Sequence, residues 1–153
     1  MQRGDVMVLT FWGHSNFQPD AYLERKLLGL LNEIVRNSPA DFYLGGYGGF
    51  DNFALECAKE FKKSHPQIKI IFISPYISES YQKNRLTQAK TIYDEIIYPE
   101  LENVPAKFAI SHRNKWMINK SDFVITHIKK SYGGAYEAYK YAKNQHKNII
   151  SFN

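Results

Sequence analysis

Four of the five residues from 45 to 49 are glycine: Gly45, Gly46, Gly48 and Gly49. Apolar residues precede them at 41–44 and an amphipathic stretch follows at 52–63, which predicts a strand, a bare-backbone loop and a helix. Glycine lets another group approach the backbone closely, and the start of a helix offers free N–H groups and a partial positive charge. The stretch therefore predicts a site for an anion, most often a phosphate.

The spacing of these glycines limits the chemistry that they can serve. It matches neither the G-x-G-x-x-G fingerprint nor a Walker A loop, so it predicts neither a standard dinucleotide site nor an ATPase. A flexible turn without a ligand is the alternative, although a plain turn rarely needs four glycines. Asp51 follows the loop, where its carboxylate could cap the helix, bind a ribose hydroxyl or act on a substrate.

A second glycine turn and the end of the first apolar run supply further candidates. Gly133, Gly134 and Ala135 come just before a predicted helix, and their N–H groups are candidates for binding a second phosphate or a carboxylate. An ordinary turn between a strand and a helix is the alternative. Gly13 and His14 directly follow the first apolar run, where His14 could donate to phosphate, act as an acid or make a structural hydrogen bond.

Polar partners for such a ligand lie on a predicted helix at 108–120. Arg113 can bind a phosphate in a bidentate way that lysine does not match, and Asn114 suits a ribose hydroxyl or a loop backbone. Glu56 and Glu137 are further carboxylates near the motifs, and ordinary helix positions explain both more simply. Three tyrosines in or beside the loops could stack on a base, with plain packing as the default interpretation: Tyr47, Tyr76 and Tyr132.

The elements that carry these residues alternate along the chain. Strands are predicted at 6–12, 41–44, 68–74, 93–98, 122–126 and 148–152. Helices are predicted at about 19–37, 52–63, 80–91, 108–120 and 135–145. Such alternation predicts an α/β fold with a mostly parallel sheet covered by helices on both sides. Ligands of these sheets lie beyond the carboxyl ends of the strands, which is where the candidate loops fall.

The composition narrows the class of protein. The chain has 153 residues, 44% of them hydrophobic, which is enough for one domain, residues 1–153, with a sizeable core. No apolar run is long enough to cross a membrane and no signal-peptide pattern is present, so a cytoplasmic protein without a membrane partner is expected. The single cysteine, Cys57, excludes a disulfide framework, and the five histidines lack metal-ligand spacing, so neither a metal nor a cofactor is predicted.

The charge of the chain is compatible with an anionic small molecule. The net charge is +5 at neutral pH. The lysines are scattered over predicted helices, however, and form no stripe interleaved with aromatic residues. The sequence therefore does not predict a nucleic-acid partner.

Three blocks of the chain together resemble the SLOG superfamily, named for the Smf/DprA and Lonely Guy proteins, and most of all its small stand-alone YpsA-like branch. The blocks are Gly13-His14, the run from Gly45 to Asp51 with Ala54, Glu56 and Ala58, and a third made of residues 113–117, 121–125, 133–135 and 141–142. Their order and spacing match over nearly the whole chain. The resemblance implies a Rossmann-like three-layer fold that binds nucleotides or nucleotide-derived molecules, and it suggests a homo-oligomer.

One block departs from the family's enzymes. The Lonely Guy enzymes, which cleave the bond between a base and ribose phosphate, carry the pattern P-G-G-x-G-T-x-x-E. The matching turn here, residues 132–137, lacks the proline, the third glycine and the threonine, and Glu137 lies too early. The departure counts against that hydrolase activity without excluding other chemistry.

Two functions follow as hypotheses. In the first, the glycine-rich loops bind a nucleotide or a nucleotide-derived ligand such as ADP-ribose, and the protein is a sensor or carrier. In the alternative, the protein is a nucleotide N-glycosidase, or a related hydrolase or transferase, acting on the base–ribose bond. The sequence leaves open whether the protein is an enzyme.

Overall fold

The chain folds around one parallel sheet whose strands alternate with helices. A computed structural model describes residues 6–153. In chain order the elements are β1 (Met7–Gly13), α1 (Ala21–Val35), β2 (Ala40–Leu44), α2 (Gly49–Ser64), β3 (Ile68–Ile73), α3 (Glu79–Tyr81), a π-helical turn (Gln82–Leu86), α4 (Thr87–Ile92), β4 (Glu95–Ile97), a 3₁₀ turn (Ala106–Phe108), α5 (Ala109–Lys120), β5 (Phe123–His127), α6 (Gly134–Asn144) and β6 (Ile149–Ser151).

The strand order places a switch point beside β1. In the described part of the chain the sheet has six strands in the order β4-β3-β2-β1-β5-β6, and each pair is parallel. The chain moves outward from β1 to β4 and then crosses back to put β5 on the other side of β1. Thr10 of β1 therefore pairs with both Tyr43 of β2 and Val124 of β5. Such a reversal is where α/β sheets open a crevice for ligands.

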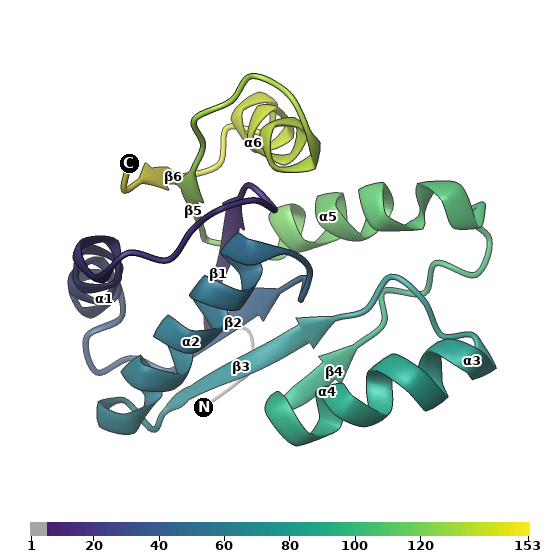
Figure 1. Ribbon diagram of the computed structural model, residues 1–153, viewed down its shortest axis with the longest axis horizontal. Helices are drawn as coiled ribbons and strands as arrows, with labels where there is room; N and C mark the ends of the chain where they lie inside the picture. The colour runs from purple at the N-terminus through teal and green to yellow at the C-terminus, as the bar shows by residue number, and fades with distance from the viewer. Residues whose placement is uncertain (1–5) are drawn as a thin grey trace.

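Helices cover both faces of the sheet and give the fold three layers (Figure 1). On one face, Leu31 of α1 and Phe53 of α2 pack in a cluster with Phe42 of the sheet. On the other face, Met117 of α5 packs in a cluster with Val124 of the sheet and residues of α6. Successive strand residues point to opposite faces, so a strand covered on both sides must be apolar throughout. The predicted α/β, Rossmann-like fold class is confirmed.

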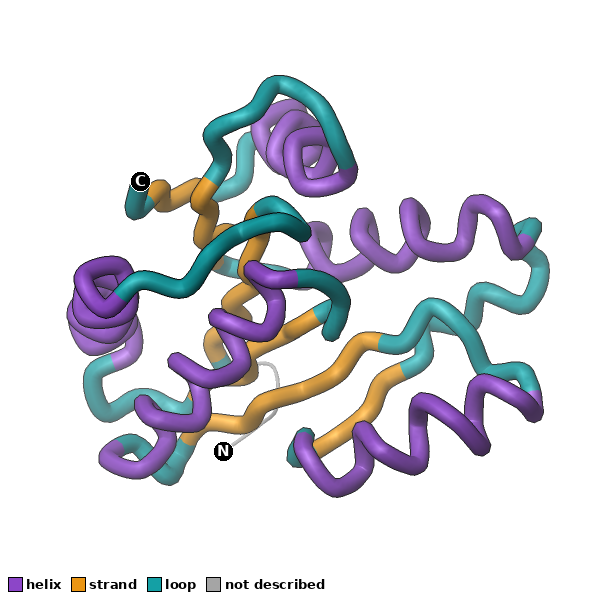
Figure 2. The backbone as a smooth tube through the Cα atoms, viewed as in Figure 1, coloured by secondary structure: helices purple, strands orange, loops and turns teal. Residues whose placement is uncertain are grey.

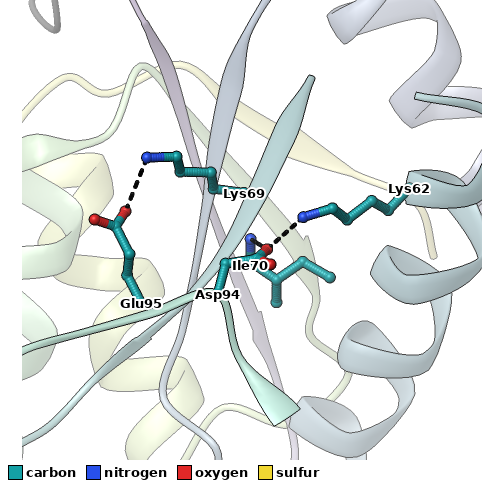
Figure 3. A network of polar contacts seen from close by, with 5 residues as sticks. All are labelled: Lys62, Lys69, Ile70, Asp94 and Glu95. Atoms are coloured by element: carbon teal, nitrogen blue, oxygen red, sulfur yellow. Dashed lines mark hydrogen bonds and ion pairs between the residues drawn. The ribbon is translucent and has the colours of Figure 1, made fainter. Parts of the chain in front are cut away.

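A polar contact sets the position of the short edge strand β4. The Asp94 carboxylate accepts the N–H of Ile70 at 2.7 Å and lies 2.7 Å from Nζ of Lys62 on α2 (Figure 3). Glu95, which begins β4, lies 3.5 Å from Nζ of Lys69. Burial raises the pKa of Asp94, but the bonds from Ile70 and Lys62 outweigh it and hold the pKa below its ordinary value. The side chain ties β4 to both β3 and α2.

Two helix starts differ from the sequence-based expectation. Helix α1 begins at Ala21 rather than at Pro19, and Asp20 caps it by accepting the N–H of Tyr22 at 2.8 Å. Helix α2 begins at Gly49 with Gly48 at the N-cap, so the prediction that Asp51 caps this helix is wrong. The physical reason is the backbone of Gly48, whose φ of +93° turns the chain into the helix before Asp51 is reached.

Candidate functional site

A cavity of about 430 Å³ lies at the carboxyl ends of β1, β2 and β5, where the strand order reverses. Its volume is in the range of small-molecule sites. Its walls come from the loops after β1 and β2, the first turn of α2, one side of α5 and the loop before α6. It is lined by Trp12, Gly13, His14, Ser15, Asn16, Gly45, Tyr47, Asp51, Ile110, Arg113, Asn114, Lys130, Tyr132, Gly133, Gly134 and Ala135.

The fold gathers most of the predicted ligand-binding residues around this cavity, although they come from four separate parts of the sequence. The lining includes Gly13, His14, Gly45, Asp51, Arg113, Asn114, Gly133, Gly134 and Ala135. The glycines at positions 46, 48 and 49 lie outside it. The predicted ligand contact of Gly46, Gly48 and Gly49 therefore has no support from the cavity.

The start of α2 is closed by the chain itself. The N–H of Gly49 donates to the carbonyl of Ser15 at 2.7 Å, and the N–H of Phe50 donates to the carbonyl of His14 at 3.3 Å. The loop after β1 therefore runs along the start of α2 (Figure 2). A Cβ on Gly49 would stand 2.5 Å from the carbonyl oxygen of Phe17. Only glycine fits at position 49, because the loop after β1 packs against it. The N–H groups expected to be free at this helix start are therefore already bonded.

Gly46 also has a packing role. Its φ is +69°, and a Cβ there would stand 2.6 Å from the ring of Phe72. The guanidinium of Arg85 donates a hydrogen bond to the carbonyl oxygen of Gly46. A larger side chain at this position would strain the backbone and collide with the core.

The start of α6, in contrast, is open toward the cavity. Gly133 is the N-cap with a φ of +93°, and Gly134 begins the helix. Both are exposed, and a Cβ on either would meet nothing within 4 Å. Among the described residues no acceptor bonds to the N–H groups of Gly134 or Ala135. Lys130 lines the same cavity, so this side of it combines unpaired N–H donors with a positive charge.

His14 holds the loop that leads to α6. Its Nε2 accepts the backbone N–H groups of Lys129 and Lys130, each at 3.0 Å. Burial and then the charge of Lys130 lower the pKa of the imidazole. The ring is therefore neutral, with its proton on Nδ1, because a protonated Nε2 would face two N–H donors. Of the three predicted roles, the structure shows the structural hydrogen bond.

Arg113 is a buried clamp for the strand ends. Its side chain is only 5% exposed. Nη1 donates to the carbonyls of Ile73 at 2.7 Å and Gly45 at 3.3 Å, and Nε donates to Oδ1 of Asn114 at 2.9 Å. Nη2 has no hydrogen-bond acceptor among the described residues. The side chain thus joins the ends of β2 and β3 and orients the Asn114 amide.

Asp51 faces Arg113 across Gly45. A Cβ on Gly45 would lie 3.2 Å from Nη2 of Arg113 and 3.4 Å from Oδ2 of Asp51, so glycine leaves room for the two charged groups. The Asp51 carboxylate accepts the N–H of Tyr47 at 2.8 Å. Burial raises the pKa of Asp51 to about 6, although the bond from Tyr47 and the charge of Arg113 both act to lower it. Asp51 is thus a carboxyl group that titrates near neutrality on the wall of a cavity.

The other candidate carboxylates lie elsewhere. Glu56 is exposed on α2 and lies 3.4 Å from Nζ of Lys59. Glu137 is exposed on α6 and lies 3.3 Å from Nζ of Lys140. Neither lines the cavity, so Asp51 alone of the three could reach a ligand in it.

Sequence reasoning missed several lining residues: Trp12, Ser15, Asn16, Ile110 and Lys130. Lys130 carried a usable signal, because it lies between the end of a predicted strand and the second glycine pair. Ile110 carried none, since its exposed position on α5 depends on how that helix packs.

His127, at the end of β5, is buried beside the cavity wall without lining it. Its ring packs edge-on against Phe17 at 5.1 Å and lies 5.3 Å from Phe152, measured between ring centroids. Burial, ahead of the charge of Lys129, lowers its pKa. The residue is a neutral member of an aromatic cluster.

Residues 6–153 contain neither a cluster of metal ligands nor a membrane-spanning helix. No group of three or more histidine, cysteine, aspartate or glutamate side chains there is arranged to hold a metal ion. No helix in that part of the chain has the length and apolar character needed to cross a membrane.

Comparison with known proteins places the chain in a family. The family model described as "YspA SLOG family" matches residues 18–151. The chain belongs to the YspA SLOG family. A curated relative, the "Uncharacterized SPbeta prophage-derived protein YoqJ" of Bacillus subtilis strain 168, is 28% identical over 137 residues, covering 79% of this chain and 80% of the relative. The predicted SLOG resemblance is confirmed.

Solved structures share the fold of this family member. DNA processing protein A of Helicobacter pylori, in a structure titled for its single-stranded DNA binding mode, superposes with a TM-score of 0.65 and 22% identity over 97% of this chain and 66% of that one. DprA of Streptococcus pneumoniae gives a TM-score of 0.65 at 14% identity, covering 95% of this chain and 50% of that one. The chain thus spans about two thirds and one half of these two proteins.

A third structure is similar over a larger share of its own length. The molybdenum cofactor binding protein of Rippkaea orientalis gives a TM-score of 0.56 at 18% identity, over 95% of this chain and 76% of that one. At such identities the likeness concerns the fold alone.

Proposed function

We propose that the cavity binds a phosphorylated ligand of the nucleotide class, such as a mononucleotide or ADP-ribose, and that the protein is a sensor or carrier for it. The observation that carries the proposal is the open start of α6. Its N–H groups at Gly134 and Ala135 have no acceptor among the described residues, and Lys130 lines the same cavity. Free N–H groups, the helix dipole and a lysine together favour a phosphate there.

The opposite wall suits a sugar. The Asn114 side chain accepts from Arg113 through Oδ1, which leaves its amide N–H groups to donate. Asp51 offers carboxylate oxygens that can accept from hydroxyl groups. Donors and acceptors fixed by a buried arginine are already ordered before a ligand arrives, so binding loses little side-chain entropy. A phosphate on one wall and a polyhydroxylated ring on the other describe a ribose phosphate.

The phosphate contact is tested by removing one N–H without altering the helix. Gly134 is the first residue of α6, a position where proline is tolerated because the helix makes no use of that N–H. We expect Gly134→Pro to weaken the binding of AMP and ADP-ribose by at least about tenfold, the value of one hydrogen bond to a charged group. Gly134→Ala keeps the N–H, has open space for its Cβ, and is the matched control.

Isothermal titration calorimetry measures both variants against the wild-type protein, with circular dichroism to confirm the fold. Equal affinities for Gly134→Pro and Gly134→Ala would show that phosphate does not bind at α6. A wild-type protein that binds neither AMP nor ADP-ribose at millimolar concentration would refute the proposal as a whole.

A second candidate function, cleavage of a base–ribose bond, is favoured by one observation. Asp51 lines the cavity with a pKa of about 6, so most of its carboxyl groups are ionised at neutral pH. In such a reaction the bond between C1′ and the base nitrogen breaks and its electron pair leaves with the base. Water then supplies a hydroxyl group to C1′ and a proton to the base nitrogen. A carboxylate beside C1′ stabilises the positive charge that develops there.

This activity predicts release of free base from nucleoside monophosphates, measured by chromatography. Asp51→Asn should abolish the release, and activity should rise through about pH 6 as the carboxyl group ionises. Glu56→Gln is the control, because Glu56 lies outside the cavity. Intact nucleotide after long incubation would leave binding without turnover as the function.

A further inference from the structure

Two tyrosines at the cavity have almost no packing partners. The Tyr47 side chain is 81% exposed and the Tyr132 side chain is 67% exposed, although both line the cavity. They come from different loops, Tyr47 from the one after β2 and Tyr132 from the one before α6. A tyrosine ring is a large apolar surface that usually finds something to cover it. Two uncovered rings at one cavity leave that surface available to a ligand.

The backbone that carries each ring is held in place. The N–H of Tyr47 donates to the Asp51 carboxylate, and Tyr47 stands between two glycines with positive φ. Tyr132 stands between Gly133 and the segment that His14 fixes through the N–H of Lys130. The loops that carry the rings are therefore anchored, and a ligand does not have to order a loose loop in order to contact the rings.

We propose that Tyr47 and Tyr132 form a ring-binding subsite of the cavity, so that its ligand carries a planar heteroaromatic ring such as a nucleobase. The inference rests on the proposed function and deepens it by assigning the base of the nucleotide ligand to two named side chains of the cavity. Tyr132 directly precedes the open start of α6, which puts an aromatic face beside the proposed phosphate position. Lys130 Nζ lies 5.8 Å from the centroid of the Tyr132 ring and adds a positive charge at the same place.

The chemistry of stacking predicts a tolerant site. Every base has an aromatic face, so stacking selects for the presence of a base more than for its identity. Purines offer the larger face and should bind more tightly than pyrimidines.

The test compares AMP with ribose 5-phosphate, which has the same sugar and phosphate but no base. For the wild-type protein we expect AMP to bind about 5- to 150-fold more tightly, the range that base–aromatic stacking gives. The double variant Tyr47→Leu/Tyr132→Leu should lose this preference while its affinity for ribose 5-phosphate stays unchanged. Tyr47→Phe/Tyr132→Phe, which keeps the rings, should retain it.

Tyr22→Leu is the matched control, because Tyr22 is 61% exposed on α1 and outside the cavity. Equal binding of AMP and ribose 5-phosphate to the wild-type protein would overturn the ring subsite while leaving the phosphate site standing. An unchanged preference in the double leucine variant would overturn it as well. If neither AMP nor ribose 5-phosphate binds, the subsite is overturned, and the proposed function fails with it when ADP-ribose does not bind either.

Discussion

The replacement Asp51→Asn should make the protein more stable at neutral pH. The pKa of Asp51 is raised from 3.8 to about 6, mainly by burial. The ionised carboxylate is therefore less favourable in the folded protein than in the unfolded chain. Each pKa unit corresponds to about 1.4 kcal/mol, and the difference between the two values costs the folded state about 3 kcal/mol once the group is ionised. Asparagine has the shape of the protonated carboxyl group and no charge, so it avoids this cost.

The sign of the pH dependence follows from proton binding. Between pH 3.8 and about 6 the folded state binds more protons than the unfolded state, so the contribution of Asp51 to stability falls as the pH rises through this window. The advantage of Asp51→Asn over the wild type should grow from about 0.5 kcal/mol near pH 4 to about 3 kcal/mol near pH 8. Other titrating groups are common to both proteins and cancel in the difference.

Urea denaturation followed by tryptophan fluorescence, at several pH values, measures this difference. Asp94→Asn is a control of opposite sign, because the pKa of Asp94 is lowered by the N–H of Ile70 and by Lys62, which together outweigh its burial. That variant should be less stable than the wild type at neutral pH, and the loss should shrink as the pH falls through the lowered pKa. The reasoning fails if Asp51→Asn is no more stable than the wild type near pH 8.

Three further predictions concern the groups that shape the cavity. Arg113→Ala should lower the free energy of unfolding by about 2–4 kcal/mol, because the carbonyls of Gly45 and Ile73, at the ends of β2 and β3, lose their side-chain donor. In the same urea assay, replacement of the exposed Arg85 by alanine should lower it by less than about 1 kcal/mol. Equal losses would contradict the role of Arg113 at the strand ends. His14→Ala should lower the free energy of unfolding by about 1–2 kcal/mol near pH 7.5, because two backbone N–H groups lose their acceptor. Because the pKa of His14 is lowered, its contribution to stability should disappear as the pH falls below about 6.5, so a pH-independent loss would count against the acceptor role. Gly49→Ala should lower the free energy of unfolding by about 1–3 kcal/mol, because its Cβ would collide with backbone oxygens. Gly134→Ala should unfold like the wild type. An unchanged stability of Gly49→Ala would show that the loop after β1 does not pack against the start of α2.

The sequence by itself determined the fold class and the edge of the sheet that carries the cavity. Strands covered on both faces need unbroken apolar runs, and helices at a surface need a one-sided stripe, so both are visible in local sequence. Parallel strands send all of their carboxyl ends to one edge. The loops at Gly13, Gly45 and Gly133 therefore had to lie along that edge, and the strand order β2-β1-β5 brings them together.

The role of Arg113 was decided by tertiary structure. Its sequence neighbours identify an arginine on a helix, which could equally lie at the surface. Only the packing of α5 over β2 and β3 buries the guanidinium and points Nη1 at the carbonyls of Gly45 and Ile73. The raised pKa of Asp51 has the same origin, since burial arises from groups distant in the sequence.

The starts of α2 and α6 are alike in local sequence but differ in the folded protein. Both α2 and α6 begin after a glycine with a φ of +93°, and both follow a strand in the same sheet, so local sequence marks each as a start with free N–H groups. At α2 the loop after β1 lies against the helix, and the carbonyls of Ser15 and His14 take the N–H groups. At α6 no such segment is present among the described residues, and the N–H groups face the cavity. Which helix start is available to an anion thus depends on a neighbouring loop that is distant in sequence, because hydrogen-bond acceptors are supplied by whatever the fold brings close.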